Sequence, residues 1–289
     1  MQHLQHELTE KFKTYLSQLG YNKSSINMLP ACVLDFLQYI RATEAKQINQ
    51  GQIKEYYGYL QNRRHKRKDT ALSESFINHN VYSLKVFFKW LEQTSQIKTN
   101  PISNIKFKQP KANNREPLSK EEIIQLFEAT ENSKEIAILH LFYSCGLRRT
   151  EAQNLNTSDI HFTQNLLYVR EGKGSKRRVI PITEKVKKEL NTYLETDRIK
   201  QPGKDQEAFF LNTRNERMKG DQYNKTLKFI LHKTEINKEI TLHHLRHSIA
   251  THLLENGLTI EFVRDFLGHT HLEATQIYAK VFKYQLKKL

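Results

Sequence analysis

Strand-like sequence is confined to one short region of this 289-residue chain, between residues 158 and 182. Two apolar runs in that region, residues 166–169 and 179–182, flank a segment with two glycines around a lysine, residues 172–176. Glycines suit a tight reversal, so the two runs are predicted to pair as an antiparallel hairpin with an exposed tip. Elsewhere the apolar residues recur every three or four positions, as they do in amphipathic helices. The chain is therefore predicted to be mainly α-helical with one small antiparallel sheet.

The first 108 residues show helical periodicity only. The first helix carries apolar residues at positions 4, 8, 12, 16 and 19 and is expected to end at Gly20. Ser24 or Ser25 is expected to open the second helix. Pro30 requires that this helix either start late or kink, because proline is tolerated only in a first turn. Two further helices, the last beginning near Ser73, complete a predicted four-helix bundle.

A break in periodicity divides the chain into two predicted domains. Residues 109–117 are polar and carry a proline near each end, which is typical of an interdomain linker. Ser119 is the expected N-cap of the next helix, with acidic residues in its first turn. We therefore predict a helical domain over residues 1–108 and an α+β domain over residues 118–289.

The chain is strongly basic, with a formal net charge of +15 and a pI of about 9.6. This balance favours a polyanionic partner, either nucleic acid or an anionic membrane surface. No apolar run is long enough to span a bilayer and residues 1–20 lack a signal-peptide core, so DNA or RNA and a cytoplasmic location are expected. Cys32 and Cys145 lie in apolar surroundings and are expected to be free, buried thiols. No Cys/His spacing indicates a metal site.

Basic residues gather at two places in the first half of the chain. A dense cluster follows the third predicted helix, and a second group lies around the linker. Such residues can contact DNA phosphates, which position a protein without reading sequence, although the cluster can equally be a solvated loop. The candidate DNA contacts here are Arg63, Arg64, Lys66, Arg67, Lys68, Lys106, Lys108 and Lys111.

The residues best suited to chemistry lie between positions 243 and 278. His243 and Arg246 are three residues apart and so share one helix face. An arginine at such a place suits bidentate binding of a phosphate or carboxylate, and His243 and His269 can donate to the same anion or move a proton. Tyr278 is a candidate nucleophile, although a phenol with a pKa of about 10 needs activation. Each residue alone is commonplace, whereas their order within this span indicates an active site.

This order resembles the tyrosine recombinases, the family of phage integrases and Xer proteins. The matching stretches are His-His-Leu-Arg-His at 243–247, Leu-Gly-His at 267–269 and Thr-Gln-Ile-Tyr at 275–278. Gly-Leu-Arg-Arg-Thr-Glu at 146–151 is similar to the family's first arginine motif, and Gly-Lys-Gly at 172–174 to its lysine loop. The resemblance covers the second half almost fully and the first half more loosely. It implies a Xer-like, two-domain protein with the fold of DNA breaking-rejoining enzymes.

The resemblance also implies a role for each matching residue. The tyrosine attacks a DNA phosphodiester and forms a 3′-phosphotyrosyl link, while two arginines and a histidine stabilise the charge on phosphorus. A lysine protonates the leaving 5′ oxygen, and no cofactor or metal is needed because the bond energy stays in the protein link. Carried over, the catalytic residues are Arg148, Lys173, His243, Arg246, His269 and Tyr278, with Glu151 orienting and Lys176 as the second lysine. Arg149 stands where the family commonly has an apolar residue, so it stays an alternative to Arg148.

Assembly and biological role follow from the same resemblance. The expected partner is a pair of double-stranded DNA recombination sites, bound by a homotetramer that is monomeric in solution. Phe282, Leu286 and Leu289 predict a tail helix that docks on a neighbouring protomer or folds back on its own core. The reaction can serve integration, inversion or dimer resolution. Two other functions stay open: type IB topoisomerase-like relaxation, and DNA-binding regulation without catalysis, which the complete set of six catalytic residues argues against.

Overall fold

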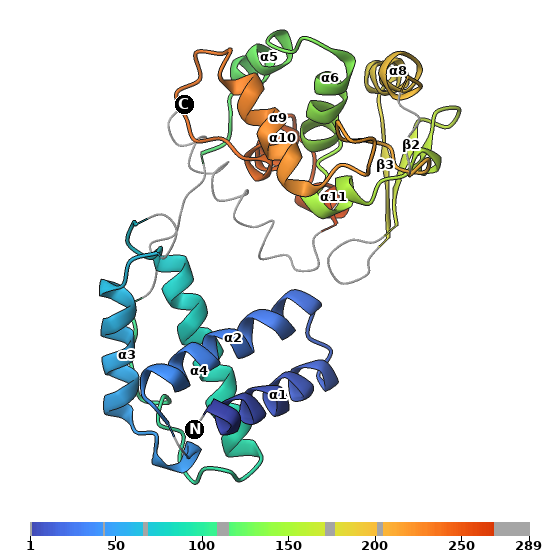
Figure 1. Cartoon of the computed structure of the whole chain (residues 1–289). Helices are drawn as coiled ribbons and strands as arrows, with labels where there is room; N and C mark the ends of the chain where they lie inside the picture. Colours follow the sequence, from blue (N-terminus) through green and yellow to red (C-terminus); the bar gives the residue numbers. More distant parts are fainter. Residues whose placement is uncertain are drawn as a thin grey trace. The chain divides into compact units, whose positions relative to one another are not determined.

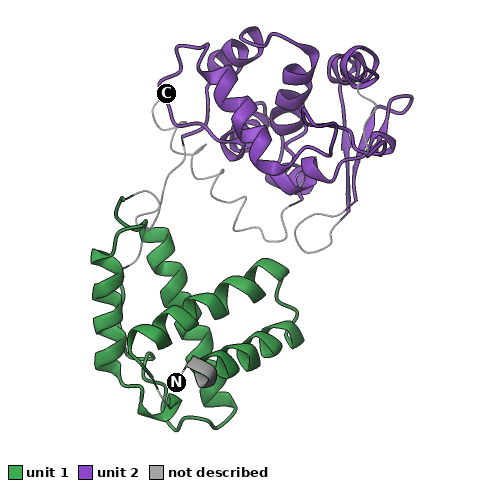
Figure 2. Ribbon diagram, viewed as in Figure 1, with its two compact units in different colours: residues 1–113 green, residues 114–289 purple. Residues whose placement is uncertain are grey.

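A computed structural model of the chain describes residues 2–42, 44–65, 69–108, 116–170, 177–200 and 205–268. The chain divides into two compact units, Met1–Asn113 and Asn114–Leu289 (Figure 2). This division lies inside the segment expected to be a linker. Most of that segment, residues 109–115, is outside the described residues, so the linker stays a prediction.

The described part of the first unit is a bundle of four α-helices (Figure 1). Their apolar faces meet in one core, in which the rings of Phe12 and Phe87 pack edge to face with centroids 5.3 Å apart. The helices are α1 (Gln2–Gln18), α2 (Lys23–Tyr39), α3 (Gln50–Asn62) and α4 (Glu74–Gln93), with a short 3-10 turn at Ala45–Gln47. The mainly α, four-helix character predicted for this half is confirmed.

The start of α2 differs from its prediction. Asn22 is the N-cap, accepting a hydrogen bond from the Ser25 N–H at 2.9 Å, so neither Ser24 nor Ser25 opens the helix. Pro30 lies well inside α2, and the helix does not start late. Pro30 is itself buried, as are Leu29 and Val33 beside it. Packing against the rest of the bundle thus outweighs the missing backbone hydrogen bond.

The second unit combines helices with a small sheet (Figure 1). Most of its described helices form around one core that includes Phe142, Leu167 and Leu245, and the last helix packs in a smaller cluster with Leu254 and Val263. Ser119 caps the first of them, as predicted. They are α5 (Lys120–Glu128), α6 (Ser133–Leu139) with a π turn at His140–Ser144, α7 (Arg149–Gln153), α8 (Glu184–Tyr193) with a π turn at Leu194–Arg198, α9 (Gly220–Leu231), α10 (Leu242–Glu255) and α11 (Ile260–Leu267).

The sheet is antiparallel, as predicted, and its described strands follow the order β1-β2-β3. Strand β2 (Leu166–Val169) pairs with β3 (Arg178–Pro181), and Val169 lies opposite Arg178 at the end nearest the hairpin tip. A short strand β1 (Ile160–His161) adds to the other side of β2 after a 3-10 turn at Thr157–Asp159. The tip itself, residues 171–176, lies outside the described residues.

Two smaller expectations concern the cysteines and the membrane. Cys32 and Cys145 are both free and buried, as predicted. Burial raises the pKa of the Cys145 thiol to about 12, so this group is an unreactive part of the core. Within the described chain, no helix has the length and apolar character needed to cross a bilayer.

Candidate active site

Arg148 is held at the start of a very short helix, α7. Gly146 precedes it with a φ of +58°, a conformation that L side chains rarely adopt, and a Cβ there would lie 2.8 Å from Leu267 Cδ2. The Arg148 N–H then donates to Glu151 Oε2 at 2.7 Å, which caps α7. The side chain donates from Nη1 to Glu151 Oε1 at 2.7 Å and from Nη2 to the Gly268 carbonyl at 2.9 Å. A glycine turn and a cap therefore fix both the backbone and the guanidinium of Arg148.

Glu151 is a buried carboxylate between two guanidinium groups. Its side chain is 1% exposed, and Arg178 donates from Nη1 to Oε1 at 2.9 Å and from Nη2 to Oε2 at 2.8 Å. Burial raises the pKa of Glu151, but the hydrogen bonds and charges of Arg178 and Arg148 outweigh burial and lower this pKa to about 2. Glu151 is therefore ionised at neutral pH and orients both arginines.

Arg246 approaches the same turn from α10. It is buried, and it donates from Nη1 to the Gly146 carbonyl and from Nη2 to the Leu267 carbonyl. Gly268 ends α11 in the left-handed conformation, with a φ of +65°. The two arginines of the predicted site are thus brought together around Gly146 and the Leu267–Gly268 segment, although 98 positions separate them in the sequence (246 minus 148).

The histidines at the start of α10 have different surroundings. The Thr241 N–H donates to His244 Nδ1 at 3.1 Å, so His244 caps the helix. His243 is exposed on the same first turn, one turn before Arg246. Arg149, the alternative to Arg148, has its side chain against Gly220 at the start of α9: a Cβ on Gly220 would lie 2.7 Å from Arg149 Cγ. Within the described residues, it is the Arg148 guanidinium that hydrogen-bonds to Glu151 and to the Gly268 carbonyl.

Several predicted residues lie outside the described part of the chain. The structure brings together Arg148, Glu151 and Arg246, and it places His243 on the same helix as Arg246. Among the residues that it describes, no three His, Cys, Asp or Glu side chains are grouped so that they could hold a metal ion. The predicted residues that lie outside are Lys66, Arg67, Lys68, Lys111, Lys173, Lys176, His269 and Tyr278, together with the tail residues Phe282, Leu286 and Leu289.

Sequence reasoning missed Arg178, which makes two side-chain hydrogen bonds to Glu151. Its only sequence signal is its place in the basic run Lys176–Arg178 at the entry to a predicted strand, where a charge reads as a solvated residue. In the structure its side chain is 8% exposed. Besides Glu151 it binds the Phe266 carbonyl through Nε at 3.0 Å.

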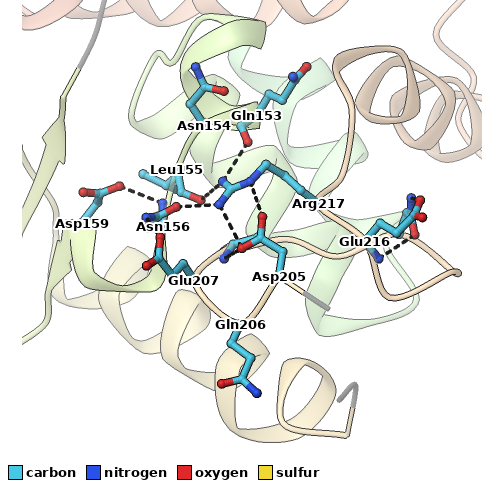
Figure 3. A network of polar contacts seen from close by, with 12 residues as sticks. Gln153, Asn154, Leu155, Asn156, Asp159, Asp205, Gln206, Glu207, Glu216 and Arg217 are labelled. Carbon is cyan, nitrogen blue, oxygen red and sulfur yellow. Dashed lines mark hydrogen bonds and ion pairs between the residues drawn. The ribbon is translucent and has the colours of Figure 1, made fainter. Parts of the chain in front are cut away.

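The far end of α7 is held by a second arginine, Arg217 (Figure 3). Its guanidinium donates to the carbonyls of Gln153 and Leu155, both at 3.2 Å. Carbonyls at the end of a helix have no hydrogen-bond partner within the helix, so Arg217 satisfies them. It also donates to Asn156 Oδ1 at 2.8 Å and pairs with Asp205 at 2.7 Å. The five-residue helix is therefore fixed at both ends, which holds Arg148 and Glu151 in a constant position.

The basic residues of the first unit are not equivalent. Arg63 donates from Nη1 to both carboxylate oxygens of Asp35, at 2.8 and 3.0 Å, and its side chain is 18% exposed. Arg64 is 69% exposed and pairs with Asp69 at 2.9 Å. Lys106 and Lys108 are exposed, and Lys108 lies 3.4 Å from Glu74 Oε1. Arg64 and the two lysines can turn toward an anion at small cost, because exposed ion pairs are weak, whereas Arg63 is tied to its carboxylate.

Comparison with known proteins identifies the family. The model of the phage integrase family matches residues 116–285 of this chain. The chain belongs to the phage integrase family. Among the family's tyrosine recombinases it is similar to XerD of Oceanobacillus iheyensis, with 34% identity over 230 residues, or 77% of this chain and 76% of XerD. It is also similar to XerA of Pyrococcus horikoshii, with 31% identity over 287 residues, or 98% and 92% of the two chains.

Solved structures of family members share the fold. The crystal structure of XerA recombinase is 28% identical, with a TM-score of 0.54 over 95% of this chain and 93% of that one. XerH bound to a palindromic difH substrate, a post-cleavage complex, is 20% identical, with a TM-score of 0.75 over 96% and 83% of the two chains. The predicted fold of DNA breaking-rejoining enzymes is thereby confirmed.

Proposed function

We propose that this protein is a site-specific DNA recombinase that cleaves and rejoins DNA through a covalent bond to Tyr278. The observation that carries the proposal is the convergence of Arg148 and Arg246 on the segment Leu267–Gly268, directly before His269. Two guanidiniums at one place suit a phosphodiester, whose charge rises as phosphorus becomes five-coordinate. Membership of the phage integrase family supports the same reaction.

The proposed first step exchanges one phosphoester bond for another. The Tyr278 oxygen attacks the scissile phosphorus, a new P–O bond forms, and the bond from phosphorus to the 5′ oxygen breaks. His243 takes the phenol proton and Lys173 gives a proton to the leaving 5′ oxygen. Arg148, Arg246 and His269 stabilise the negative charge on the nonbridging oxygens. A 5′-hydroxyl of a partner strand then reverses the step, so that neither cofactor nor metal takes part.

The proposed partner is double-stranded DNA, bound as two recombination sites by a tetramer assembled from monomers. The exposed Arg64, Lys106 and Lys108 support phosphate contacts by the first unit, and Lys66, Arg67, Lys68, Lys111 and Lys176 are proposed to add to them. Arg63 is also proposed as a phosphate contact, made while its guanidinium stays paired with Asp35. We propose that residues 1–108 form the DNA-binding domain and residues 118–289 the catalytic domain, joined by a linker at residues 109–117.

Covalent capture of DNA tests this function without knowledge of the site. The purified protein is mixed with a library of random-sequence duplexes that each carry one nick, and denaturant-stable adducts are isolated and sequenced. Release of the short nicked strand traps the intermediate. We expect adducts that share one sequence motif, referred to below as the captured duplex. Absence of adducts with the wild-type protein would contradict the proposal.

The tyrosine is tested in the same assay. Tyr278→Phe removes the attacking oxygen and leaves the ring, so DNA binding on native gels is expected to be unchanged while adducts disappear. Adducts formed by this variant would assign the reaction to another residue, with Tyr284 as the next candidate. Relaxation of a supercoiled plasmid that lacks the captured motif would instead favour the topoisomerase-like alternative. The comparisons favour neither that alternative nor a non-catalytic regulator.

A further inference from the structure

The proposed reaction leaves Arg178 without a role, although this residue is more buried than Arg148. The side chain of Arg178 is 8% exposed, against 19% for Arg148. It lies at the start of β3, opposite Val169, and so at the base of the hairpin whose tip contains Lys173. From there it reaches α7 through Glu151 and the end of α11 through the Phe266 carbonyl. Arg178 therefore joins three segments that each carry or adjoin a proposed catalytic residue.

The two arginines share each oxygen of one carboxylate. Glu151 Oε1 accepts from Arg178 Nη1 and from Arg148 Nη1, at 2.9 and 2.7 Å. Glu151 Oε2 accepts from Arg178 Nη2 and from the Arg148 main-chain N–H, at 2.8 and 2.7 Å. Arg178 thus holds the carboxylate by a fork of two hydrogen bonds, the geometry that an arginine–carboxylate pair prefers. Arg148 uses one side-chain nitrogen on the same carboxylate.

The charge balance of this cluster decides what Arg148 can offer to DNA. Two guanidiniums and one carboxylate leave a single positive charge in a largely buried place. Without Arg178, Arg148 and Glu151 would form an isolated neutral pair, and a buried carboxylate with one partner binds that partner strongly. The guanidinium of Arg148 would then neutralise Glu151 and lose its attraction for a phosphate. Arg178 prevents this because it neutralises Glu151 itself.

We propose that Arg178 is a positioning residue for DNA cleavage: by binding Glu151 through both oxygens it leaves the charge of Arg148 to the scissile phosphate. The proposal rests on the proposed function. It concerns a residue that does not touch the reacting atoms and acts through Arg148. Arg178→Ala is expected to slow adduct formation by about 10- to 100-fold, the range for residues that orient a reacting group. Arg178→Lys keeps the charge but loses the fork, so its defect is expected to be smaller.

A neutral phosphate separates this role from a merely structural one. In the captured duplex the scissile phosphate is replaced by a methylphosphonate, which carries no negative charge. A residue that acts through charge on Arg148 matters little on this substrate, so Arg178→Ala and Arg148→Ala are both expected to approach wild-type rates. Equal defects of Arg178→Ala on the two substrates would overturn the proposal, as would a normal rate on the ordinary one.

A compensating change tests the charge balance directly, and Arg178→Lys remains the informative variant if Arg178→Ala folds poorly. Glu151→Gln removes the carboxylate, so the double variant Arg178→Ala, Glu151→Gln again has one positive charge on Arg148. We expect it to cleave the ordinary captured duplex faster than Arg178→Ala alone. A double variant that is equally slow or slower would overturn the proposal.

Arg198 provides a matched control in the same unit. It is half-buried and donates to the main-chain carbonyls of Asp205, Gln206 and Ala208. Arg198→Ala is expected to change the cleavage rate by the same factor on both substrates, and a defect confined to the charged substrate would overturn the assignment to Arg178. Failure of the proposed function is recognised separately, because the wild-type protein would then form no adduct with any duplex.

Discussion

Glu151 is the residue on which the charge of the candidate site depends. A carboxylate that is 1% exposed is costly to bury unless cations and hydrogen bonds compensate for lost water. Here four hydrogen bonds from Arg148 and Arg178, one of them from the Arg148 main-chain N–H, supply that compensation and lower the pKa of Glu151 to about 2. The residue that sequence comparison presents as a minor part of an arginine motif is therefore an anchor for both arginines.

This lowered pKa predicts how stability depends on pH. A group whose pKa is lower in the folded protein stabilises it above the unfolded-state value and loses that contribution as pH falls toward the folded value. A shift from the ordinary 4.5 to about 2 corresponds to about 3 kcal/mol. Urea unfolding should show wild type more stable than Glu151→Gln at pH 7, with the difference shrinking between about pH 4.5 and 2. Glu128→Gln, at an exposed position of α5, is the matched control for removing one carboxylate. A difference between wild type and Glu151→Gln that stays constant over this pH range would contradict the prediction.

Lys173 is tested by the chemistry of its leaving group. When sulfur replaces the bridging 5′ oxygen of the captured duplex, the leaving thiolate needs no proton, so a general acid becomes dispensable. Lys173→Ala is expected to be inactive on the ordinary duplex and active on the sulfur-substituted one. The same measurement on Lys176→Ala identifies which lysine of the hairpin tip has the role. Equal defects of Lys173→Ala on both duplexes would exclude it as the acid.

Among the elements, α7 shows how a short helix can be made rigid enough to orient a side chain. Five residues are too few for a helix to be stable by itself. Glu151 caps its first turn, Arg217 binds carbonyls at its last turn, and the Gly146 turn sets its direction. The helix is thus held by contacts with β3, α11 and the loop around Asp205.

The Gly146 turn offers a test of this arrangement. Gly146→Ala places a Cβ at a φ of +58° and 2.8 Å from Leu267 Cδ2, so we expect a loss of about 1–3 kcal/mol in the free energy of unfolding of the second unit. Thermal or urea unfolding measures it. Gly58→Ala, inside α3 with no atom within 4 Å of the added Cβ, should instead stabilise the first unit by about 0.5–1 kcal/mol. Equal stability of Gly146→Ala and wild type would contradict the account of the turn.

At the scale of the whole molecule, the C-terminal tail predicts how protomers assemble. The tail residues lie outside the described part of the chain, so the prediction rests on their sequence. A short helix with the apolar stripe Phe282, Leu286 and Leu289 is marginal in water and needs a surface to pack on. We propose docking on a neighbouring protomer rather than on the tail's own core, which would close a cyclic assembly of four.

Truncation after Lys280 tests this assembly. The shortened protein is expected to bind a single captured duplex normally on native gels, to form no complex of two duplexes, and to show an altered level of adducts. Phe282→Ala, which keeps the tail but weakens its stripe, should reduce paired complexes to a smaller extent. Normal paired complexes from the truncated protein would show that the tail does not dock between protomers.

Much of the fold was predictable because its signals are local. Helical spacing, the helix start near Ser73, the cap at Ser119 and the two apolar runs of the hairpin depend on neighbours a few positions away, and the structure bears them out. Pro30 was judged by the same local rule, which left either a late start or a kink, and the late start is wrong because α2 begins at Lys23. Pro30 is buried by residues that lie far away in the sequence, so the sequence around it could not predict this burial.

The sequence by itself determined the order and chemical identity of the candidate site: two arginines, two histidines, a lysine and a tyrosine in the spacing of one family. The tertiary structure alone decided which groups pair with the charge of Arg148 and how its guanidinium is oriented. Glu151 meets Arg178 across 27 positions and Arg148 meets Gly268 across 120. Contacts at such separations arise only when β3, α7 and α11 pack together, and the burial that this packing creates is what makes the carboxylate and its partners interdependent.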